Sequence, residues 1–488
     1  MSSIKQSEEV TFKLSNLILI LGLGGIVTSL LFANIPAFGI ISLFPLICIG
    51  CILLLKYPWL ILFVIFTLNY FIMGITRYFP IEGISLIMDI SYVIALIIIF
   101  IHASLYQNIE LRRAIHVLSI ISFVWMLYCF LELVNPTASL EGWFLSRGLI
   151  VNGLIMTILA SLLCTRYKIF KALFFTLSLF TLLAVLKGLA QKYIGFDVYE
   201  QKWLDEGGRI THIIWSGTRY FSFFTDASNM GANLAAASMF FGISAFYMRS
   251  SIYKIYYLIV AILSFLVMLT SGTRGAIIIP LGGLALYAII SKQTTTIIGS
   301  ACTLLFIYAF FAFTTIGQGN STIRRMRTAF NPTEDASFNV RIENQKKLAS
   351  YLKYKPLGEG LGLSGDRLGE KVSRRFTTSI PNDSWYVKIW VETGIIGLIL
   401  YLSMIFISMA KGGWIIATQI KDSELKGQLA GLLCGIFGMF LNAYSNSFWG
   451  QFPTMMIAFM GLTFVLNGPY FDQDIQKDKR TILNNQVL

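Results

Sequence analysis

The sequence predicts an all-α polytopic membrane protein with about 12 to 14 transmembrane helices. Hydrophobic residues make up 56% of its 488 positions and charged residues only 13%, a balance that is foreign to water-soluble domains of this length. Apolar windows of about 17 to 25 residues, long enough to cross the hydrocarbon core of a bilayer, recur between short polar hinges. Backbone amides in hydrocarbon must pair within their own element, so we expect these windows to be helices.

Two long polar segments interrupt the series of apolar windows. The windows lie near residues 14–33, 37–55, 58–75, 84–104, 114–133, 146–164, 169–190, 229–248, 252–270, 275–291, 294–316, 384–410, 427–446 and 451–467. They predict N-terminal transmembrane helices (1–190), a first loop (191–228), central transmembrane helices (229–316), a large basic loop (317–383), C-terminal transmembrane helices (384–467) and a tail (468–488).

Positive charge in the short hinges predicts the orientation, because short loops rich in Lys and Arg stay in the cytoplasm. Alternate hinges are basic, as at Arg112 and Arg249, and so is the tail around Lys479. This pattern puts both termini in the cytoplasm and both long loops, 191–228 and 317–383, on the outer side. The net charge of +13 exceeds what the hinges explain, and a basic outer loop indicates an anionic ligand. Nucleic acid is not an expected partner, because the basic residues lie on two sides of a membrane.

No metal site or cofactor is predicted. All six cysteines fall within predicted spans, so no disulfide framework is expected on the outer side. Cys48 and Cys51 have a metal-like spacing, but no second pair and no histidine accompanies them.

The first long loop ends in an aromatic segment that runs from Arg219 to Asp226 and leads into the window 229–248. Asp226 and Ser228 stand where helix N-caps are expected, and capping is the simpler interpretation of both. Arg219 is a candidate for binding an anionic headgroup, at a depth where aromatic residues commonly form an interfacial belt.

A very short hinge, Leu269-Thr-Ser-Gly-Thr-Arg274-Gly-Ala, joins the windows 252–270 and 275–291. Arg274 must therefore lie at or just below the outer interface, where an unpaired charge costs on the order of 2 kcal/mol or more. This cost favours a functional role, and snorkelling toward lipid headgroups is the alternative. Gly272 and Gly275 would allow a backbone or a ligand to approach closely.

The second long loop is rich in arginine. Arg324 and Arg327 lie near its start, and Arg341 lies on a segment with helical spacing that stops at Pro356. Guanidinium groups bind phosphate oxygens in pairs, and several together suit a pyrophosphate. For Arg324 and Arg327, a solvated basic face against lipid headgroups is an alternative of equal weight.

Two carboxylates open the window 384–410. Asp383 is expected at the start of this membrane helix, within reach of the arginine-rich loop. It either caps the helix or orients or deprotonates a sugar hydroxyl. Glu392 lies about two and a half turns deeper, where a buried carboxylate must be paired or protonated.

These motifs follow one another in a fixed order: Thr-Ser-Gly-Thr-Arg274-Gly-Ala, then Arg341 on a helix that ends in Lys-Pro356-Leu-Gly-Glu-Gly-Leu-Gly, then Asp383 with Glu392, Gly394 and Gly397. The order, over residues 215–465, resembles the bacterial O-antigen ligase and O-antigen polymerase family. The resemblance implies a metal-independent glycosyltransferase of the inner membrane with a periplasmic active face. It also implies a glycan donor linked to undecaprenyl diphosphate, with lipid A core as acceptor in a ligase or another lipid-linked repeat in a polymerase.

By position, Arg274 and Arg341 match the family's two arginines, which implies that they bind the donor diphosphate. Asp383 stands where many ligases have a histidine, nine residues before the glutamate matched by Glu392. An unperturbed aspartate is a poor base near neutral pH, so Asp383 needs its proton affinity raised by its surroundings or only orients the hydroxyl. His212, the one histidine expected on the outer side, is a backup base.

A transporter or flippase for lipid-linked glycans is the alternative from another class, because it too needs many helices and cations that face a diphosphate. Such proteins usually place charges inside their spans along a translocation path, whereas Arg274, Arg341 and Asp383 are expected together on one side. The enzyme is therefore the preferred hypothesis, with a ligase slightly favoured over a polymerase. The expected partners are the lipid-linked donor, a lipid A core or glycan acceptor, and membrane lipids.

Overall fold

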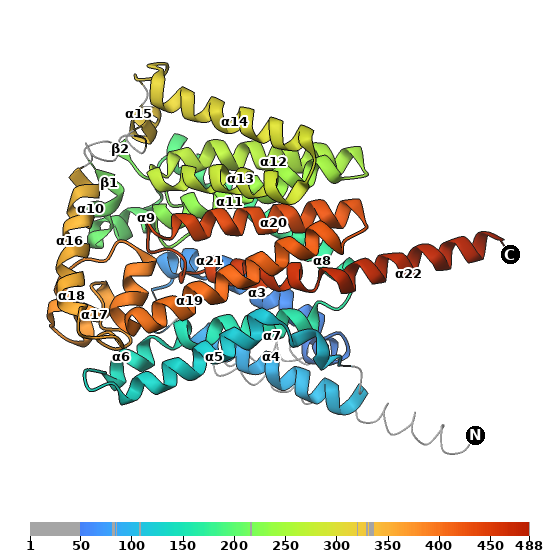
Figure 1. Ribbon diagram of the computed structural model, residues 1–488, viewed down its shortest axis with the longest axis horizontal. Coiled ribbons are helices and arrows are strands. Elements are labelled where there is room, and N and C mark those ends of the chain that lie inside the picture. Colours follow the sequence, from blue (N-terminus) through green and yellow to red (C-terminus); the bar gives the residue numbers. More distant parts are fainter. Residues whose placement is uncertain are drawn as a thin grey trace, which may run out of the picture. The chain divides into compact units, whose positions relative to one another are not determined.

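The computed structural model describes residues 49–80, 83, 85–106, 109–214, 217–319, 321–327, 330 and 336–487. The described chain is almost entirely helical (Figure 1). The strands found within it form one small antiparallel hairpin in the first long loop, β1 (Ile213–Ile214) and β2 (Gly217–Thr218), with Ile213 opposite Thr218. The prediction of an all-α polytopic membrane protein is confirmed.

Every predicted window from 58–75 onward coincides with a helix. These helices are α3 (Trp59–Tyr78), α4 (Ser85–Tyr106), α5 (Val117–Leu131), α7 (Gly153–Leu163), α8 (Tyr167–Tyr193), α11 (Ala227–Tyr247), α12 (Ser251–Thr270), α13 (Ile278–Ser291), α14 (Thr294–Phe313), α19 (Trp385–Thr418), α20 (Ser423–Asn442) and α21 (Thr454–Leu466). The window 14–33 lies outside the described residues, and 37–55 lies mostly outside them.

Within the described residues, nine helices are long and apolar enough to cross a membrane, or up to ten if the bent pair of α21 and α22 (Gly468–Val487) is one span. The predicted number was higher for two reasons. The windows 146–164 and 294–316 form shorter apolar helices, and the first two windows fall outside or mostly outside the described part.

Short helices fill the connections. They are η1 (Leu111–Ala114), η2 (Glu132–Val134), α6 (Leu140–Leu145), η3 (Gly148–Asn152), α9 (Val198–Trp203), η4 (Leu204–Gly208), α10 (Arg209–His212), η5 (Arg274–Ile277), α15 (Ser321–Arg327), α16 (Ala336–Leu352), α17 (Arg367–Val372) and α18 (Phe376–Ser379). The segment with helical spacing around Arg341 is therefore a helix that ends before Pro356, as predicted.

The chain divides into two units. The described residues 49–61 and 94–106 belong to the smaller unit, and residues 62–93 and 109–487 belong to the larger one. In the smaller unit, Nδ1 of His102 lies 2.8 Å from the carbonyl oxygen of Leu55, which joins the end of α4 to the segment before α3.

The larger unit is built around α11 and α20, whose apolar windows are 78% and 83% buried. Glycines in α20 allow the close packing, because a Cβ at Gly435 would lie 2.3 Å from the ring of Phe240 and one at Gly438 would lie 2.3 Å from the carbonyl oxygen of Ile279. Small residues at such contacts let membrane helices approach each other closely. The helices beside this pair are held in fixed positions as a result.

The helix α19 is broken at Gly394, whose φ is 66°. The loop after α16 reaches this break: the amides of Glu359 and Gly360 donate to the carbonyl oxygens of Val391 (2.8 Å) and Glu392 (3.1 Å). A Cβ at Gly394 would lie 1.9 Å from the carbonyl oxygen of Pro356, so only glycine fits. The second long loop is thus anchored in the membrane helix that follows it.

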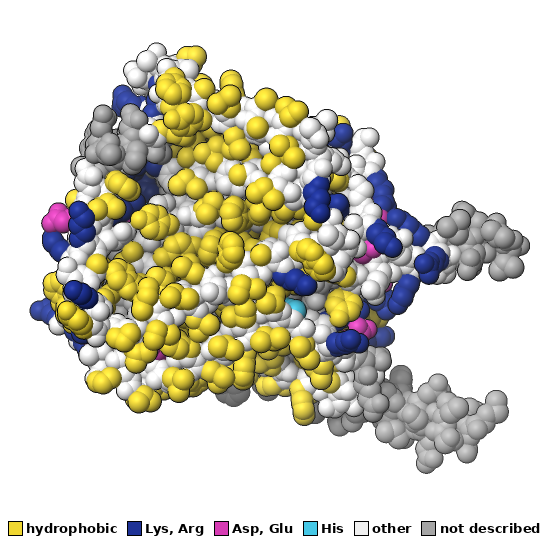
Figure 2. Space-filling model, in the orientation of Figure 1, with side chains coloured by type: hydrophobic (Ala, Val, Ile, Leu, Met, Phe, Trp, Pro, Cys, Tyr) yellow, Lys and Arg dark blue, Asp and Glu magenta, His cyan; other side chains and the backbone are white. Residues whose placement is uncertain are grey.

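The connections of the larger unit gather at two ends. Parts of both long loops meet near the turn after α12, where Arg219 and Arg325 donate to the carbonyl oxygens of Ser271 and Gly272; we call this the loop end. At the other end, basic hinges contact the segment before α20, as Arg249 does through an ion pair with Asp422. Hydrophobic side chains cover the helices between these ends, and Lys and Arg gather toward them (Figure 2). The sequence pattern that put both long loops on one side agrees with this arrangement.

Candidate functional site

A cleft of about 900 Å³ opens at the loop end of the larger unit. Its walls come from the segment 145–152, the first long loop, the turn between α12 and α13, the second long loop, the start of α19 and the connection between α20 and α21. Most of the candidate residues line this cleft: His212, Arg219, Asp226, Arg274, Arg341 and Asp383. The other candidates, Arg324, Arg327 and Glu392, do not line it.

Arg219 lies at the cationic part of the cleft. Its guanidinium donates to the carbonyl oxygens of Ser271 (3.2 Å) and Thr211 (3.0 Å) and to the hydroxyl of Thr273 (3.1 Å). Burial lowers the pKa of Arg219; the charge of Asp226 raises it, and the like charges of Arg274 and Arg341 lower it further. Arg219 is thus close enough to Arg274 and to Arg341 to be repelled by each, which favours an anion in this part of the cleft.

Arg274 begins the turn η5, directly after the tight turn at Gly272, whose φ is +60°. The close approach expected at Gly275 is made by the protein itself, because a Cβ there would lie 2.4 Å from Oδ1 of Asn442 and 2.5 Å from the hydroxyl of Ser445. The end of α20 and the residues after it therefore pack against this turn, and this contact fixes the backbone position of Arg274.

Arg341 and Asp383 form an ion pair across the cleft wall, with 3.0 Å between Nε and Oδ2. The side chains are 29% and 54% exposed, so solvent and ligands can reach the pair. The expectation that Asp383 lies within reach of the arginine-rich loop is confirmed. Its interpretation as a helix cap is wrong, because the hydroxyl of Ser384 accepts from the amide of Val387 and caps α19.

Asp226 caps α11, as the simpler interpretation held: its Oδ1 accepts from the amides of Ser228 (2.7 Å) and Asn229 (2.9 Å). The same interpretation is wrong for Ser228, which lies in the first turn of the helix. Its Oδ2 accepts from Nε2 of Gln451 at 3.1 Å. The carboxylate therefore joins the start of α11 to the connection between α20 and α21. Arg77 of α3 fixes the preceding turn, because it donates to the carbonyl oxygens there, including that of Ser222 at 2.8 Å.

His212 has both ring nitrogens engaged. Nδ1 lies 3.0 Å from the carbonyl oxygen of Gly208, and Nε2 accepts from the amide of Ala227 at 3.3 Å. Burial lowers the pKa of His212 to about 4, so the ring is neutral at physiological pH. These bonds favour a structural role, in which His212 ties the first long loop to α11, over that of a base.

The side chains of the remaining candidates lie outside the cleft. Arg327 donates to the carbonyl oxygen of Ile316 at 2.6 Å and to the hydroxyl of Thr314 at 3.2 Å, so it holds α15 to the end of α14. Arg324 is exposed on α15. Glu392 is fully buried, and its Oε1 accepts from the hydroxyl of Ser364 at 2.5 Å.

Sequence reasoning missed several residues that line the cleft, among them Arg325, Asp366, Lys388 and the polar segment 445–447. Lys388 was detectable by the rule that singled out Glu392, because it is an ionisable residue within a predicted span. Arg325 carried the same signal as its neighbours Arg324 and Arg327 in the arginine-rich segment. Asp366 and the segment 445–447 carried no comparable signal, since short polar residues in a connection are ordinary.

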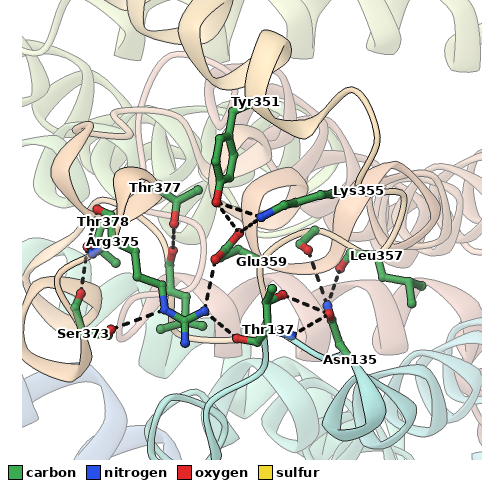
Figure 3. A network of polar contacts seen from close by, with 12 residues as sticks. Asn135, Thr137, Tyr351, Lys355, Leu357, Glu359, Ser373, Arg375, Thr377 and Thr378 are labelled. Atoms are coloured by element: carbon green, nitrogen blue, oxygen red, sulfur yellow. Dashed lines mark hydrogen bonds and ion pairs between the residues drawn. The ribbon is translucent and has the colours of Figure 1, made fainter.

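A buried carboxylate anchors the second long loop through a network of polar contacts (Figure 3). Glu359 is 3% exposed and accepts from Nζ of Lys355 (2.7 Å), Nη1 of Arg375 (3.1 Å) and the hydroxyl of Tyr351 (3.2 Å). Arg375 also donates to the carbonyl oxygen of Thr137. Burial alone would lower the pKa of Lys355, but Glu359 and Tyr351 raise it above its ordinary value. The network joins α16, the loop after it and the connection after α5.

Residues 259–402, less than a third of the chain, match the O-antigen ligase family. The match confirms the resemblance to O-antigen ligases and polymerases over this segment, which holds Arg274, Arg341 and Asp383. No curated protein matches the chain. The match supports a glycosyltransferase of the O-antigen ligase and polymerase type in a multi-pass membrane protein.

We expect Glu359→Ala to destabilise the protein by about 2 to 4 kcal/mol, because it leaves two cations around a buried site without their carboxylate. Thermal unfolding of the purified protein in detergent measures the effect. Glu343→Ala, which removes an exposed carboxylate of the same loop that pairs with Lys347, is the matched control and should leave the melting temperature unchanged. Equal melting temperatures for the two variants would contradict the anchoring role.

Proposed function

We propose that the protein is a metal-independent glycosyltransferase that moves a glycan from undecaprenyl diphosphate to an acceptor sugar at the periplasmic face of the bacterial inner membrane. The observation that carries this proposal is the cleft in which Arg219, Arg274 and Arg341 lie together with Asp383. The O-antigen ligase match over residues 259–402 supports the class of reaction.

The arginines serve the donor in this proposal. When the bond between the anomeric carbon and the diphosphate oxygen breaks, negative charge grows on the leaving diphosphate. Guanidinium groups stabilise that charge most effectively where they are already in place and partly desolvated. Arg219 meets this condition through its bonds to Ser271 and Thr273, and Arg274 and Arg341 face the same space.

Asp383 serves the acceptor. The acceptor oxygen forms the new bond to the anomeric carbon, and its proton passes to the carboxylate. In the resting protein this carboxylate is paired with Arg341. A donor diphosphate that binds Arg341 competes with Asp383 for the guanidinium, so donor binding would release the carboxylate toward the acceptor hydroxyl.

A ligase that uses lipid A core as acceptor is the preferred form of this proposal, and a polymerase of lipid-linked repeats is the second candidate. A transporter or flippase is less well supported, because the cleft charges gather at the loop end rather than along the spans. Arg219, Arg341 and Asp383 lie outside the candidate spans, and Arg274 and Lys388 lie within the first four residues of theirs.

Arg274→Ala and Arg341→Ala should each reduce glycan transfer by about a hundredfold or more, because each removes a cation that stabilises the leaving diphosphate. Transfer is measured with purified protein in lipid nanodiscs and an undecaprenyl-diphosphate-linked glycan. Arg209→Ala is the matched control, since Arg209 lies in the first long loop, is 55% exposed and pairs with Asp205 outside the cleft. Normal transfer by both cleft variants would refute the diphosphate role.

The exchange of Arg341 between Asp383 and a diphosphate predicts a coupling between these two residues. Asp383→Asn should tighten the binding of inorganic pyrophosphate by about fivefold, because the guanidinium no longer has a competing partner. The same substitution made in an Arg341→Gln background should have little effect. Calorimetric titration of the four proteins of this cycle measures the coupling.

Glu370→Gln is the control for this cycle, because it removes another carboxylate that lines the cleft and has no ion pair with Arg341. If Asp383→Asn tightened pyrophosphate binding equally with and without Arg341, the effect would come from the general repulsion between the carboxylate and the anion. This result would contradict the exchange.

Deletion of the gene, followed by gel analysis of surface glycans, distinguishes the two enzymes. A ligase predicts that all long glycan disappears from lipid A while lipid-linked polymer accumulates. A single repeat that remains attached to lipid A would identify a polymerase, and an unchanged glycan profile would contradict both.

A further inference from the structure

Two charged residues in the cleft have no part in the reaction as proposed so far. Asp366 precedes α17, and Lys388 lies in the first turns of α19; both line the cleft and they form an ion pair with each other. Their side chains are 29% and 14% exposed, so the pair is sheltered but open to the cleft.

The backbone places this pair beside Asp383. The amide of Asn382 donates to the carbonyl oxygen of Gly365 at 3.2 Å, and a Cβ at Gly365 would lie 1.7 Å from the carbonyl oxygen of Ile380. Asp366 directly follows Gly365 in the chain, and Asp383 directly follows Asn382. Two carboxylates therefore border the same part of the cleft, one on each of two segments in direct contact.

The pair has hydrogen-bonding capacity to spare. Oδ1 of Asp366 accepts from the amides of Leu368 (3.0 Å) and Gly369 (2.9 Å), and Oδ2 accepts from Lys388. A carboxylate has about four acceptor positions and an ammonium has three donors. Each partner can therefore bind a further group without losing the bonds that hold it.

Glu392 supports Lys388 from below. Its Oε1 lies 3.7 Å from Nζ of Lys388, and its side chain is fully buried. Lys388 is thus held between a buried carboxylate and one that faces the cleft. A purely structural ion pair would need no opening to the cleft, whereas this pair is part of its wall.

The charge at this place suits an uncharged ligand. Asp366 and Lys388 neutralise each other, and Glu370 adds a further negative charge to the same wall. A diphosphate is repelled there, in contrast to the arginine end. A sugar hydroxyl both donates and accepts, so neighbouring hydroxyls can donate to the carboxylate of Asp366 and accept from the ammonium of Lys388.

From this arrangement we infer that Asp366 and Lys388 form a binding subsite for the acceptor sugar, next to the carboxylate that receives its proton. The inference rests on the proposed function and extends it. Asp366 contributes to acceptor affinity and to the choice of acceptor, and Asp383 contributes to turnover.

The test separates affinity from turnover. Initial rates are measured in nanodiscs at saturating donor with two acceptor probes, core oligosaccharide released from lipopolysaccharide and undecaprenyl-diphosphate-linked glycan repeat. Asp366→Asn keeps the acceptor oxygen that caps α17 and removes the charge. It should raise the acceptor KM by about tenfold, which corresponds to about 1.4 kcal/mol, and change kcat by less than about threefold.

The donor KM and the affinity for inorganic pyrophosphate should stay unchanged in Asp366→Asn, which also shows that the variant is folded. Asp205→Asn, which removes an exposed carboxylate from the first long loop outside the cleft, should leave every parameter unchanged. An acceptor KM equal to that of the unaltered protein, or a donor KM that rises by the same factor, would overturn the subsite.

Direct binding distinguishes failure of the subsite from failure of the proposed function. The fluorescence of the tryptophans, two of which line the cleft as Trp203 and Trp385, reports binding of the two probes without turnover. Binding of either probe that weakens at least about fivefold in Asp366→Asn supports the subsite even if no transfer occurs. If the unaltered protein binds neither probe, the subsite is refuted.

Discussion

The break of α19 at Gly394 is the constraint on which the site depends. It frees the carbonyl oxygens of Val391 and Glu392 for the amides of Glu359 and Gly360, so a loop is hydrogen-bonded to a membrane helix where a regular helix has no acceptor to offer. The close approach of Pro356 excludes any side chain at position 394. Because this loop directly follows α16, the break fixes the helix that carries Arg341 relative to the helix preceded by Asp383.

The two parts of the cleft hold their charges in different ways. At the arginine end, Arg219 and Arg325 are held by carbonyl oxygens of the turn after α12. A carbonyl group orients a guanidinium without neutralising its charge, so the positive potential remains for an anion. In the part of the cleft that Asp383 borders, Arg341 is paired with Asp383 and Lys388 with Asp366, so cation and carboxylate compensate each other. The cleft is thus polarised along its length by the choice of partner rather than by the number of cations.

The helices and the candidate site were predictable from the sequence to different extents. Apolar length predicted each of the apolar membrane helices from α3 onward, because the bilayer imposes that length on every span, but it gave no sign of the short loop helices or of α22. The rule that short basic hinges stay in the cytoplasm placed Arg274, Arg341 and Asp383 on the same side of the membrane. The structure brings the three residues into one cleft. The cap of α19 was assigned one residue too early, because Asp383 and Ser384 are both good capping residues and the choice between them depends on tertiary contacts. Asp366 gave no signal, since its place beside Asp383 depends on the contact of Gly365 with Ile380.

The difference in partners also bears on how the site can respond to substrate. A bond from Arg219 to the carbonyl oxygen of Ser271 cannot be exchanged without moving the turn itself, so the arginine end is preorganised and an anion bound there requires little reorganisation. An ion pair between two partly exposed side chains contributes little net stability, so a ligand group can replace one partner at small cost. The Arg341 and Asp383 pair, with its 54% exposed carboxylate, is of this second kind. In the proposed function this pair lies between the groups that serve the donor and those that serve the acceptor, so donor binding would change the state of Asp383 without any movement of the helices.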